Sequence, residues 1–405
     1  MGCGLEGDPV LSAGEVRRRF AWARRQGRPA WLWPDIAIAD WRRALVQIEG
    51  ATSAVLAGNE GVTLAAALPA IGLAGYTSGM GPLLGLWVEQ GRLGVDDGVG
   101  EVLARHLAHN RIRTARMGAA ACDLVETLAA RGVEAVLLKG AHTGARYFPE
   151  PGARPASDID LLVRSAEVPI AEAALGRGGL FLKSRGRWES SWDSAAARPV
   201  PRTLTYVHAD DPWSVDLHGS LNIAAGAASP VADLDAAEPM RGFGGLDQPL
   251  LLLHLAAHAG AGWQNLTLLR QVELVLVIRE DTRVGRLSWE AFLDVGGRTR
   301  ALGYAYPGLR LCEVLAPGTV PVAVLERCAD RAPAAVRRAI ARMTPASAQR
   351  IDRSSLAEHF MWSPGWGGSL RQLASDILPD VRSWPELLGI YEERAWRLIR
   401  GRVSH

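Results

Sequence analysis

Lysine is nearly absent from this chain: only Lys139 and Lys183 occur among 405 residues, and arginine supplies the rest of the 45 basic side chains. Such a bias replaces lysine wherever either cation serves. A lysine that persists therefore marks a position that needs a compact ammonium group rather than a planar guanidinium. The net charge is small as well, at +2, so no global positive field favours nucleic acid as a partner.

Cysteine is scarce too, and its pattern argues against proteins that are held together by structural zinc or by disulfides. The four residues are Cys3, Cys122, Cys312 and Cys328, without a CxxC pair or a histidine at metal-site spacing. This argues against a structural zinc site and, more strongly, against a disulfide framework. Scattered free thiols fit a reducing compartment, and the first twenty residues lack the pattern of a signal peptide. We therefore expect a cytoplasmic protein.

Charge is missing altogether from one long stretch, residues 61–88. A run of this length could cross a bilayer as one helix. It also contains Pro69, Pro82 and several glycines, with a turn-like segment at residues 75–79. These breakers fit two short buried helices better than one span. We expect no membrane insertion.

The remaining composition, 48% apolar and 22% charged, is typical of a globular protein, and the length suggests two or three domains. Helical periodicity dominates the first third of the chain and returns in the last part, whereas short strand-like runs gather between them. We therefore predict an α+β fold with a small mixed β-sheet. The predicted parts are a helical N-terminal region, a sheet-containing α/β core and a mostly helical C-terminal region, at residues 1–132, 133–245 and 246–405.

Within the core, apolar runs and chain breakers place the elements. Three prolines make residues 149–155 a loop, because proline breaks both helices and strand ladders. Strands are predicted at residues 133–138, 157–163, 204–208 and 213–218, and helices at residues 141–148 and 168–175. After the core, strongly apolar helices are predicted at residues 250–259 and 266–278.

The segment Asp158-Ile159-Asp160 carries the clearest chemical signal. Residues two apart on a strand face the same side, so both carboxylates converge while Ile159 points into the core. Carboxylates this close repel each other unless a cation lies between them. Magnesium prefers oxygen ligands and is commonly bound by a few carboxylates together with substrate phosphates. The pattern therefore predicts a magnesium site for phosphoryl or nucleotidyl transfer.

A third carboxylate is expected on a neighbouring strand. Asp216 lies within the alternating segment at residues 213–218, where it could bind a metal ion or accept the proton of an attacking hydroxyl. Residues before Asp158 are candidates for holding phosphate: Gly140 between a strand and a helix, and Lys139, Arg154 and Ser157 as side-chain donors.

These segments resemble a known family. Leu137-Leu138-Lys139-Gly140, Gly152-Ala153-Arg154-Pro155 and the run from Ser157 to Val163 are similar to the signature of an uncharacterised nucleotidyltransferase family of bacteria. That family is a branch of the DNA polymerase β-like nucleotidyltransferase superfamily. More loosely, residues 215–218 resemble its third-acid strand, His254 and His258 its histidine-bearing helix, and residues 378–396 its C-terminal end.

The resemblance implies magnesium-dependent transfer of a nucleotide from an NTP to a hydroxyl acceptor. Family members often accompany gene clusters for peptide natural products, which implies a small-molecule or peptide acceptor and a role in natural-product biosynthesis. On this basis Asp158, Asp160 and Asp216 are assigned as catalytic and metal-binding residues. The triphosphate is assigned to four residues: Lys139, Gly140, Arg154 and Ser157.

Two departures from the family pattern stand out. The superfamily usually has a Gly-Ser pair at the phosphate turn, where this chain has Gly140-Ala141. The helix after His258 usually has an acid near position 271 or 272, where this chain has Gln271 and Val272, followed by Glu273.

His254 and His258 lie four apart on one helical face. They are either ligand contacts or, as we favour, buried histidines with satisfied hydrogen bonds.

Two alternative functions stay open at this point. The fold could be retained without catalysis, as an accessory protein that binds a nucleotide or a peptide, which the altered phosphate turn would suit. The protein could also add nucleotides to the 3′ end of an RNA, although the near-neutral net charge argues against this.

Overall fold

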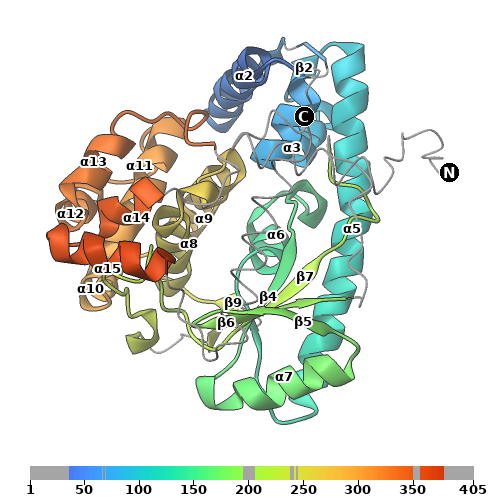
Figure 1. The fold of residues 1–405 in the computed structure, drawn as a ribbon. Coiled ribbons are helices and arrows are strands. Elements are labelled where there is room, and N and C mark those ends of the chain that lie inside the picture. The colour runs from blue at the N-terminus through green and yellow to red at the C-terminus, as the bar shows by residue number, and fades with distance from the viewer. Residues whose placement is uncertain are drawn as a thin grey trace, which may run out of the picture.

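The computed structural model describes residues 36–377 except residues 66, 69, 195–205, 238–240, 243–244 and 350–355. Helices surround one small five-stranded sheet (Figure 1), so the predicted α+β class is confirmed. The predicted similarity of residues 378–396 to the family's C-terminal end falls outside the described residues.

The N-terminal part consists of helices packed around their own apolar core. The uncharged stretch forms two short helices, as expected, with a break at Gly79. Within the described residues, no helix combines the length and apolar character needed to cross a membrane. The helices are α2 (Ile38–Leu56), α3 (Ala70–Ser78), α4 (Gly81–Glu89) and α5 (Asp97–Ala129), with a two-stranded sheet of β1 (Thr63–Leu64) and β2 (Gly94–Val95).

The central sheet has the strand order β3-β4-β7-β6-β5. Only β4 and β7 run parallel; the other neighbours are antiparallel. Its strands are β3 (Val136–Leu137), β4 (Asp158–Leu162), β5 (Phe181–Arg185), β6 (Glu189–Asp193) and β7 (Ser214–His218). Helices α6 (Ala141–Tyr147) and α7 (Val168–Arg177) lie at their predicted places.

Two strand predictions need correction. Strands β5 and β6 were not predicted from the sequence, although both belong to the sheet. The strand predicted at residues 204–208 is wrong for residues 206–208, which form no strand. Because β7 already has β4 and β6 on its two sides, no position beside it is left. Tyr206 and His208 instead pack their rings against His109 of α5, with centroids 5.2 and 4.2 Å apart.

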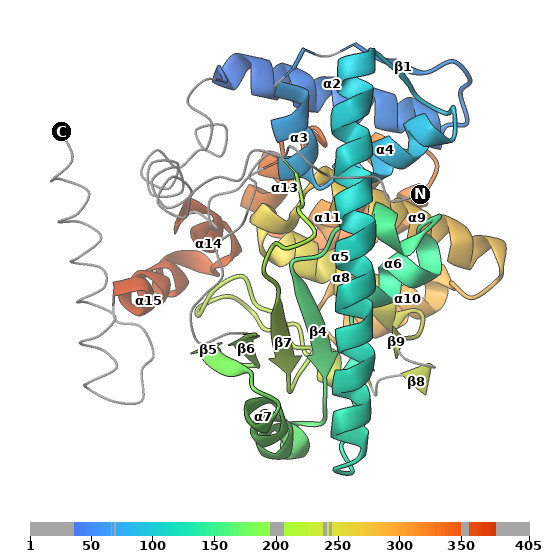
Figure 2. The ribbon, with the colours of Figure 1, turned by 90° about the vertical axis from the view of Figure 1, so that its right-hand side faces the viewer.

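The two faces of the sheet differ sharply. On one face, apolar side chains from β4 and β7 pack against α5 and α7, which Figure 2 shows beside and below the strands. This cluster includes Ile159, Leu161, Val215 and Leu217. Since side chains alternate along a strand, Asp158, Asp160 and Asp216 occupy the opposite face. Packing of the apolar face therefore orients the acids.

The C-terminal helices lie on the side of that polar face, to the left of the sheet and mostly higher than it in Figure 1. They form the largest apolar cluster, in which α8 and α11 are central. Their bounds are α8 (Leu250–Ala261), α9 (Leu268–Arg283), α10 (Trp289–Arg298), α11 (Leu302–Leu315), α12 (Val322–Arg331), α13 (Ala334–Ile340), α14 (Leu356–Trp362) and α15 (Gly365–Ile377), preceded by the hairpin of β8 (Arg241–Gly242) and β9 (Gly245–Leu246).

The predicted domain boundaries stay a prediction. Helix α5 contributes Leu103 and Leu107 to the N-terminal core and Met117 and Ala121 to the core beneath the sheet. Leu268 of α9 also packs in the N-terminal core. These shared residues tie the sheet to both helical parts, so the polar face lies between elements held by common packing.

Candidate active site

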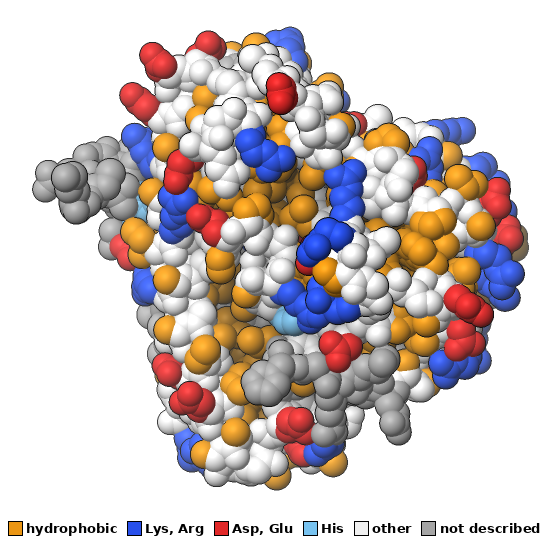
Figure 3. All heavy atoms as spheres, turned by 180° about the vertical axis from the view of Figure 1, so that it is seen from behind, with side chains coloured by type: hydrophobic (Ala, Val, Ile, Leu, Met, Phe, Trp, Pro, Cys, Tyr) orange, Lys and Arg blue, Asp and Glu red, His pale blue; other side chains and the backbone are white. Residues whose placement is uncertain are grey.

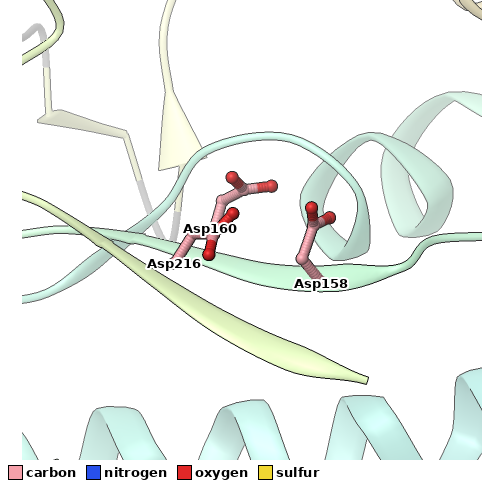
Figure 4. Close-up of side chains that lie close together, drawn as sticks. All are labelled: Asp158, Asp160 and Asp216. Carbon is pink, nitrogen blue, oxygen red and sulfur yellow. The ribbon is translucent and has the colours of Figure 1, made fainter. Parts of the chain in front are cut away.

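Three carboxylates meet on the polar face of the sheet. Asp158 and Asp160 belong to β4, and the parallel register places Asp216 of β7 beside Asp160. One oxygen from each side chain lies within 4.8 Å of the others. Figure 4 shows all three carboxylates on the same side of the two strands. The convergence predicted from the sequence is therefore present, and we call these three residues the triad.

Asp160 is the best-anchored member of the triad. Its Oδ1 accepts a hydrogen bond from Lys139 Nζ at 2.7 Å and lies 3.1 Å from His218 Nε2. Burial alone would raise the pKa of Asp160, but the Lys139 ammonium and then His218 hold it well below its usual range. The carboxyl is 2% exposed, and its Oδ2 has no hydrogen-bond partner. The ionised Asp160 carboxylate thus has one oxygen, Oδ1, fixed by hydrogen bonds, while Oδ2 is available to a ligand.

The other two acids are disfavoured as anions. Burial raises the pKa of Asp158, and the adjacent Asp160 raises it further. Burial likewise raises the pKa of Asp216 to about 6, with smaller contributions from Asp158 and Asp160. Crowded carboxylates of this kind call for a cation between them. The oxygen-only donor set, together with the unpartnered Oδ2 of Asp160, fits a hard divalent ion such as magnesium.

A second buried charge cluster lies beside the triad. Glu273 of α9 binds Arg154 Nε through Oε1 and Arg270 Nη1 through Oε2, each at 2.8 Å. The Thr143 hydroxyl of α6 also donates to Oε1. Burial opposes ionisation of Glu273, but Arg154 and Arg270 lower its pKa to about 2. Glu273, which follows Gln271 and Val272, is thus a buried, fully paired acid of α9.

Arginines in this second cluster retain capacity for an anion. Arg154 is 3% exposed, and its Nη2 is buried without a hydrogen-bond partner. Arg270 is partly accessible, at 22% of its side chain, and its charge acts on both Asp158 and Asp160. Arg270 was not predicted as a site residue, because only the fold brings α9 opposite β4.

The turn before α6 is adjacent to the first acid. Gly140 has a φ of 64°, a left-handed conformation that favours glycine, and lies near the backbone of Asp158. Lys139 directs its ammonium to Asp160, so its predicted contact with a triphosphate stays a prediction. Ser157 is exposed and immediately precedes β4. Gly140, Arg154 and Ser157 therefore lie near the Asp158 end of the triad, whereas Lys139 reaches Asp160.

A pocket of about 350 Å³ opens over this end and contains both Asp158 and Asp216. The missed strands supply part of its wall through Lys183, Ser191 and Asp193. Lys183 Nζ lies 3.5 Å from Asp193 Oδ1. A larger, mainly hydrophobic cavity of about 490 Å³ lies between α5 and α6, where Figure 3 shows a hollowed face. It includes Gly140 and Arg154 but no triad residue.

His254 and His258 stand on α8 with ring centroids 5.9 Å apart. Burial lowers the pKa of His254 to about 3, and Lys139 adds to this effect. For His254 the expected burial is present, but the expected hydrogen bonds are not, since neither of its ring nitrogens has a partner. His258 is half-buried rather than buried.

Comparison with known proteins identifies the family of this chain. No curated protein and no solved structure matches it. A model of a family described as uncharacterised nucleotidyltransferase matches residues 80–317, more than half of the chain, and this span includes the whole triad, Lys139, Arg154 and Glu273. The resemblance seen in the sequence is thereby confirmed, and the chain belongs to this family of nucleotidyltransferase enzymes.

Proposed function

We propose that this enzyme transfers a nucleotide, with magnesium, from an NTP to a hydroxyl group on a small molecule or peptide. The observation that carries the proposal is the triad, whose ligand oxygens lie within 4.8 Å and include the unpartnered Oδ2 of Asp160. Family membership supports the nucleotide donor. The magnesium requirement and the acceptor are our inference from the chemistry of the oxygen ligands and the surrounding pockets.

In this proposal each residue near the triad has a distinct task. Asp158, Asp160 and Asp216 would hold magnesium, which supplies positive charge against the triphosphate when bound. Lys139 and His218 fix Asp160 Oδ1, so that Oδ2 keeps one direction. Arg154, Arg270 and the turn at Gly140 would hold the triphosphate near Asp158. Asp216 is the group assigned to accept the proton of the attacking hydroxyl.

The test is a thermal-shift titration of the four NTPs with magnesium. A ligand that binds only the folded state raises the melting temperature by mass action. We expect one NTP or more to do so with magnesium, and Asp160→Asn to abolish the shift. The control is Asp294→Asn, which alters an exposed aspartate of α10 that pairs only with Arg298 among the described residues.

A shift that persists in Asp160→Asn would place the nucleotide elsewhere and reject this site. Absence of any shift, in a folded wild type, would favour an accessory protein over an NTP-dependent enzyme. A salt-sensitive affinity for tRNA would instead favour transfer to an RNA end.

A further inference from the structure

A second polar pocket adjoins the triad at its other end. It has a volume of about 290 Å³ and lies where β7 ends, between the sheet and α8. We call it the histidine pocket, and its walls include Trp188, His218, Asn222, His254, His258 and Asn265. His218 links it to the triad, because its Nε2 lies 3.1 Å from Asp160 Oδ1.

His254 shows that the histidine pocket needs a hydrogen-bonding ligand. The side chain is 3% exposed, and both ring nitrogens are buried without a partner. Buried polar groups are satisfied in the great majority of folded proteins, so an imidazole with two open positions calls for an explanation. The ring lines the histidine pocket, and a polar group seated there is the available partner.

The walls favour an uncharged ligand rich in hydroxyl groups. Burial lowers the pKa of both His254 and His258, so both rings are neutral near pH 7 and each offers one donor and one acceptor. The Asn265 amide also combines both functions, and Asn222 adds a donor, since its Oδ1 already accepts from the Asp235 N–H. A hydroxyl group is likewise both donor and acceptor, and these walls can therefore bind several hydroxyls of one molecule.

Charged groups of the pocket do not favour an ionic ligand. Arg187 and Glu189 also line it, but both are exposed. The Arg187 guanidinium lies 4.8 Å from the centre of the Trp188 ring, and Glu189 Oε2 lies 3.4 Å from His218 Nδ1. Their opposite charges leave no excess of one sign. The half-buried Trp188 offers an aromatic surface for the C–H face of a ring.

The position relative to the triad favours the acceptor over the donor. In the proposed function, the residues that hold the triphosphate gather near Asp158. An in-line displacement places the attacking and leaving oxygens on opposite sides of the phosphorus. The attacking hydroxyl then comes from the side of Asp160, which is the side of His218 and the histidine pocket.

We propose that the histidine pocket binds the acceptor and that the acceptor is an uncharged polyhydroxy compound, a sugar or a polyol. This proposal rests on the proposed function. One hydroxyl oxygen forms a bond to the α-phosphorus of the NTP as the bond from that phosphorus to the bridging oxygen breaks. Pyrophosphate leaves, and the hydroxyl proton passes to Asp216 and then to solvent. The pocket volume is near the small end of ligand sites, about 300 Å³, which suits a single sugar unit.

The experiment measures pyrophosphate release with magnesium and the NTP that stabilises the wild type. The acceptor probes are glucose, mannitol, glucosamine, glucose 6-phosphate and a serine-containing peptide. We expect a neutral sugar or polyol to stimulate release most. His254→Phe keeps a ring and removes its hydrogen bonds, so the KM for that acceptor should rise at least tenfold while the NTP-induced thermal shift stays. His254→Asn should restore part of the loss.

Matched variants separate binding from folding. His142→Phe makes the same change at a half-buried histidine of α6, whose Nε2 is also buried without a partner but which does not line the histidine pocket, and it should leave the KM for the acceptor unchanged. If His254→Phe does not fold, Asn265→Ala removes another wall group, and the KM for the acceptor should again rise.

Three results would overturn the proposal. They are stimulation only by glucosamine, glucose 6-phosphate or the peptide, no stimulation by any neutral probe, and a KM unchanged in His254→Phe, which would mean that water alone satisfies His254. If an NTP still raises the melting temperature of the wild type in these cases, the proposed nucleotidyl transfer stands and only the acceptor proposal is rejected. If no NTP raises that melting temperature, both proposals are rejected.

Discussion

Asp160 and Glu273 are two buried carboxylates, each bound by two basic side chains. They differ in how many of their oxygens have a hydrogen-bond partner. Glu273 has both oxygens satisfied, by Arg154 and Thr143 on Oε1 and by Arg270 on Oε2. Asp160 has Lys139 and His218 on one oxygen and no partner on the other. A carboxylate with both oxygens paired orients its neighbours, whereas one with an unpaired oxygen leaves a position for a ligand. We therefore expect Asp160 to matter most for activity and Glu273 for stability.

The largest effect is expected from Asp160→Asn. The amide keeps the size of the side chain but removes a charge that the triad needs for a cation. Nucleotide transfer should fall by at least 10²–10³-fold, the order seen when one electrostatic group of an active site is removed. Steady-state pyrophosphate release measures this loss. Activity within a factor of ten of wild type would contradict the assignment of Asp160 as a metal ligand.

Glu273→Gln should lower the stability of the folded protein more than its activity, in contrast to Asp160→Asn. The substitution leaves Arg154 buried and without its carboxylate partner, and the side chains of that pair are 2% and 1% exposed. Breaking a buried pair in this way costs about 3–5 kcal/mol of unfolding free energy. Urea denaturation measures it, with Asp294→Gln as an exposed control. A loss below about 1 kcal/mol would mean that the two arginines find other partners.

The same cluster predicts a pH dependence. The folded-state pKa of Glu273, about 2, lies below its ordinary value of 4.5. Its contribution is therefore present above pH 4.5 and is lost as the pH falls toward 2, by about 3 kcal/mol at 1.36 kcal/mol per pKa unit. Urea denaturation across this range should show that the unfolding free energy falls more steeply with decreasing pH in wild type than in Glu273→Gln. Equal slopes would indicate that Glu273 is not ionised in the folded state.

The contrast between the two clusters also explains what the sequence could predict. The triad was predictable because its geometry is local: strand residues two apart share a face, and Asp216 lies in an alternating segment. The uncharged stretch was likewise resolved correctly by its own prolines and glycines. The α+β class followed from where helical and strand-like periodicity occur along the chain.

What could not be predicted depends on contacts between distant segments. All five residues of β5 are exposed, and β6 is mostly polar, so neither strand has the apolar alternation of a half-buried strand. Lys183, Ser191 and Asp193 were therefore missed as part of the pocket wall. The pairing of Arg154 with Glu273 joins residues 119 positions apart. No local pattern indicates it, and Arg154 was predicted only as a candidate for holding phosphate.

Adding magnesium without nucleotide tests whether the triad binds a cation, and the expected effect is smaller than the preceding ones. If the triad lacks only a cation, magnesium without nucleotide should stabilise the wild type, by about 2.7 kcal/mol at a hundred times the Kd. Asp216→Asn should lose this stabilisation, whereas Glu273→Gln should keep it on a lower baseline. Thermal melts with magnesium and with EDTA measure the difference. An equal gain in wild type and Asp216→Asn would move the ion away from the triad.

Lys139→Arg should give the smallest effect, and it tests why this lysine persists in a chain of arginines. The Lys139 side chain is 7% exposed and reaches Asp160 with its ammonium. A longer, planar guanidinium must displace its neighbours there, at a cost of about 1–3 kcal/mol for an overpacked interior. The matched control is Lys183→Arg, because that side chain is 35% exposed and pairs loosely with Asp193. Urea denaturation should separate the two variants. If both are equally tolerated, the ammonium has no special role, and the anchoring of Asp160 rests on His218.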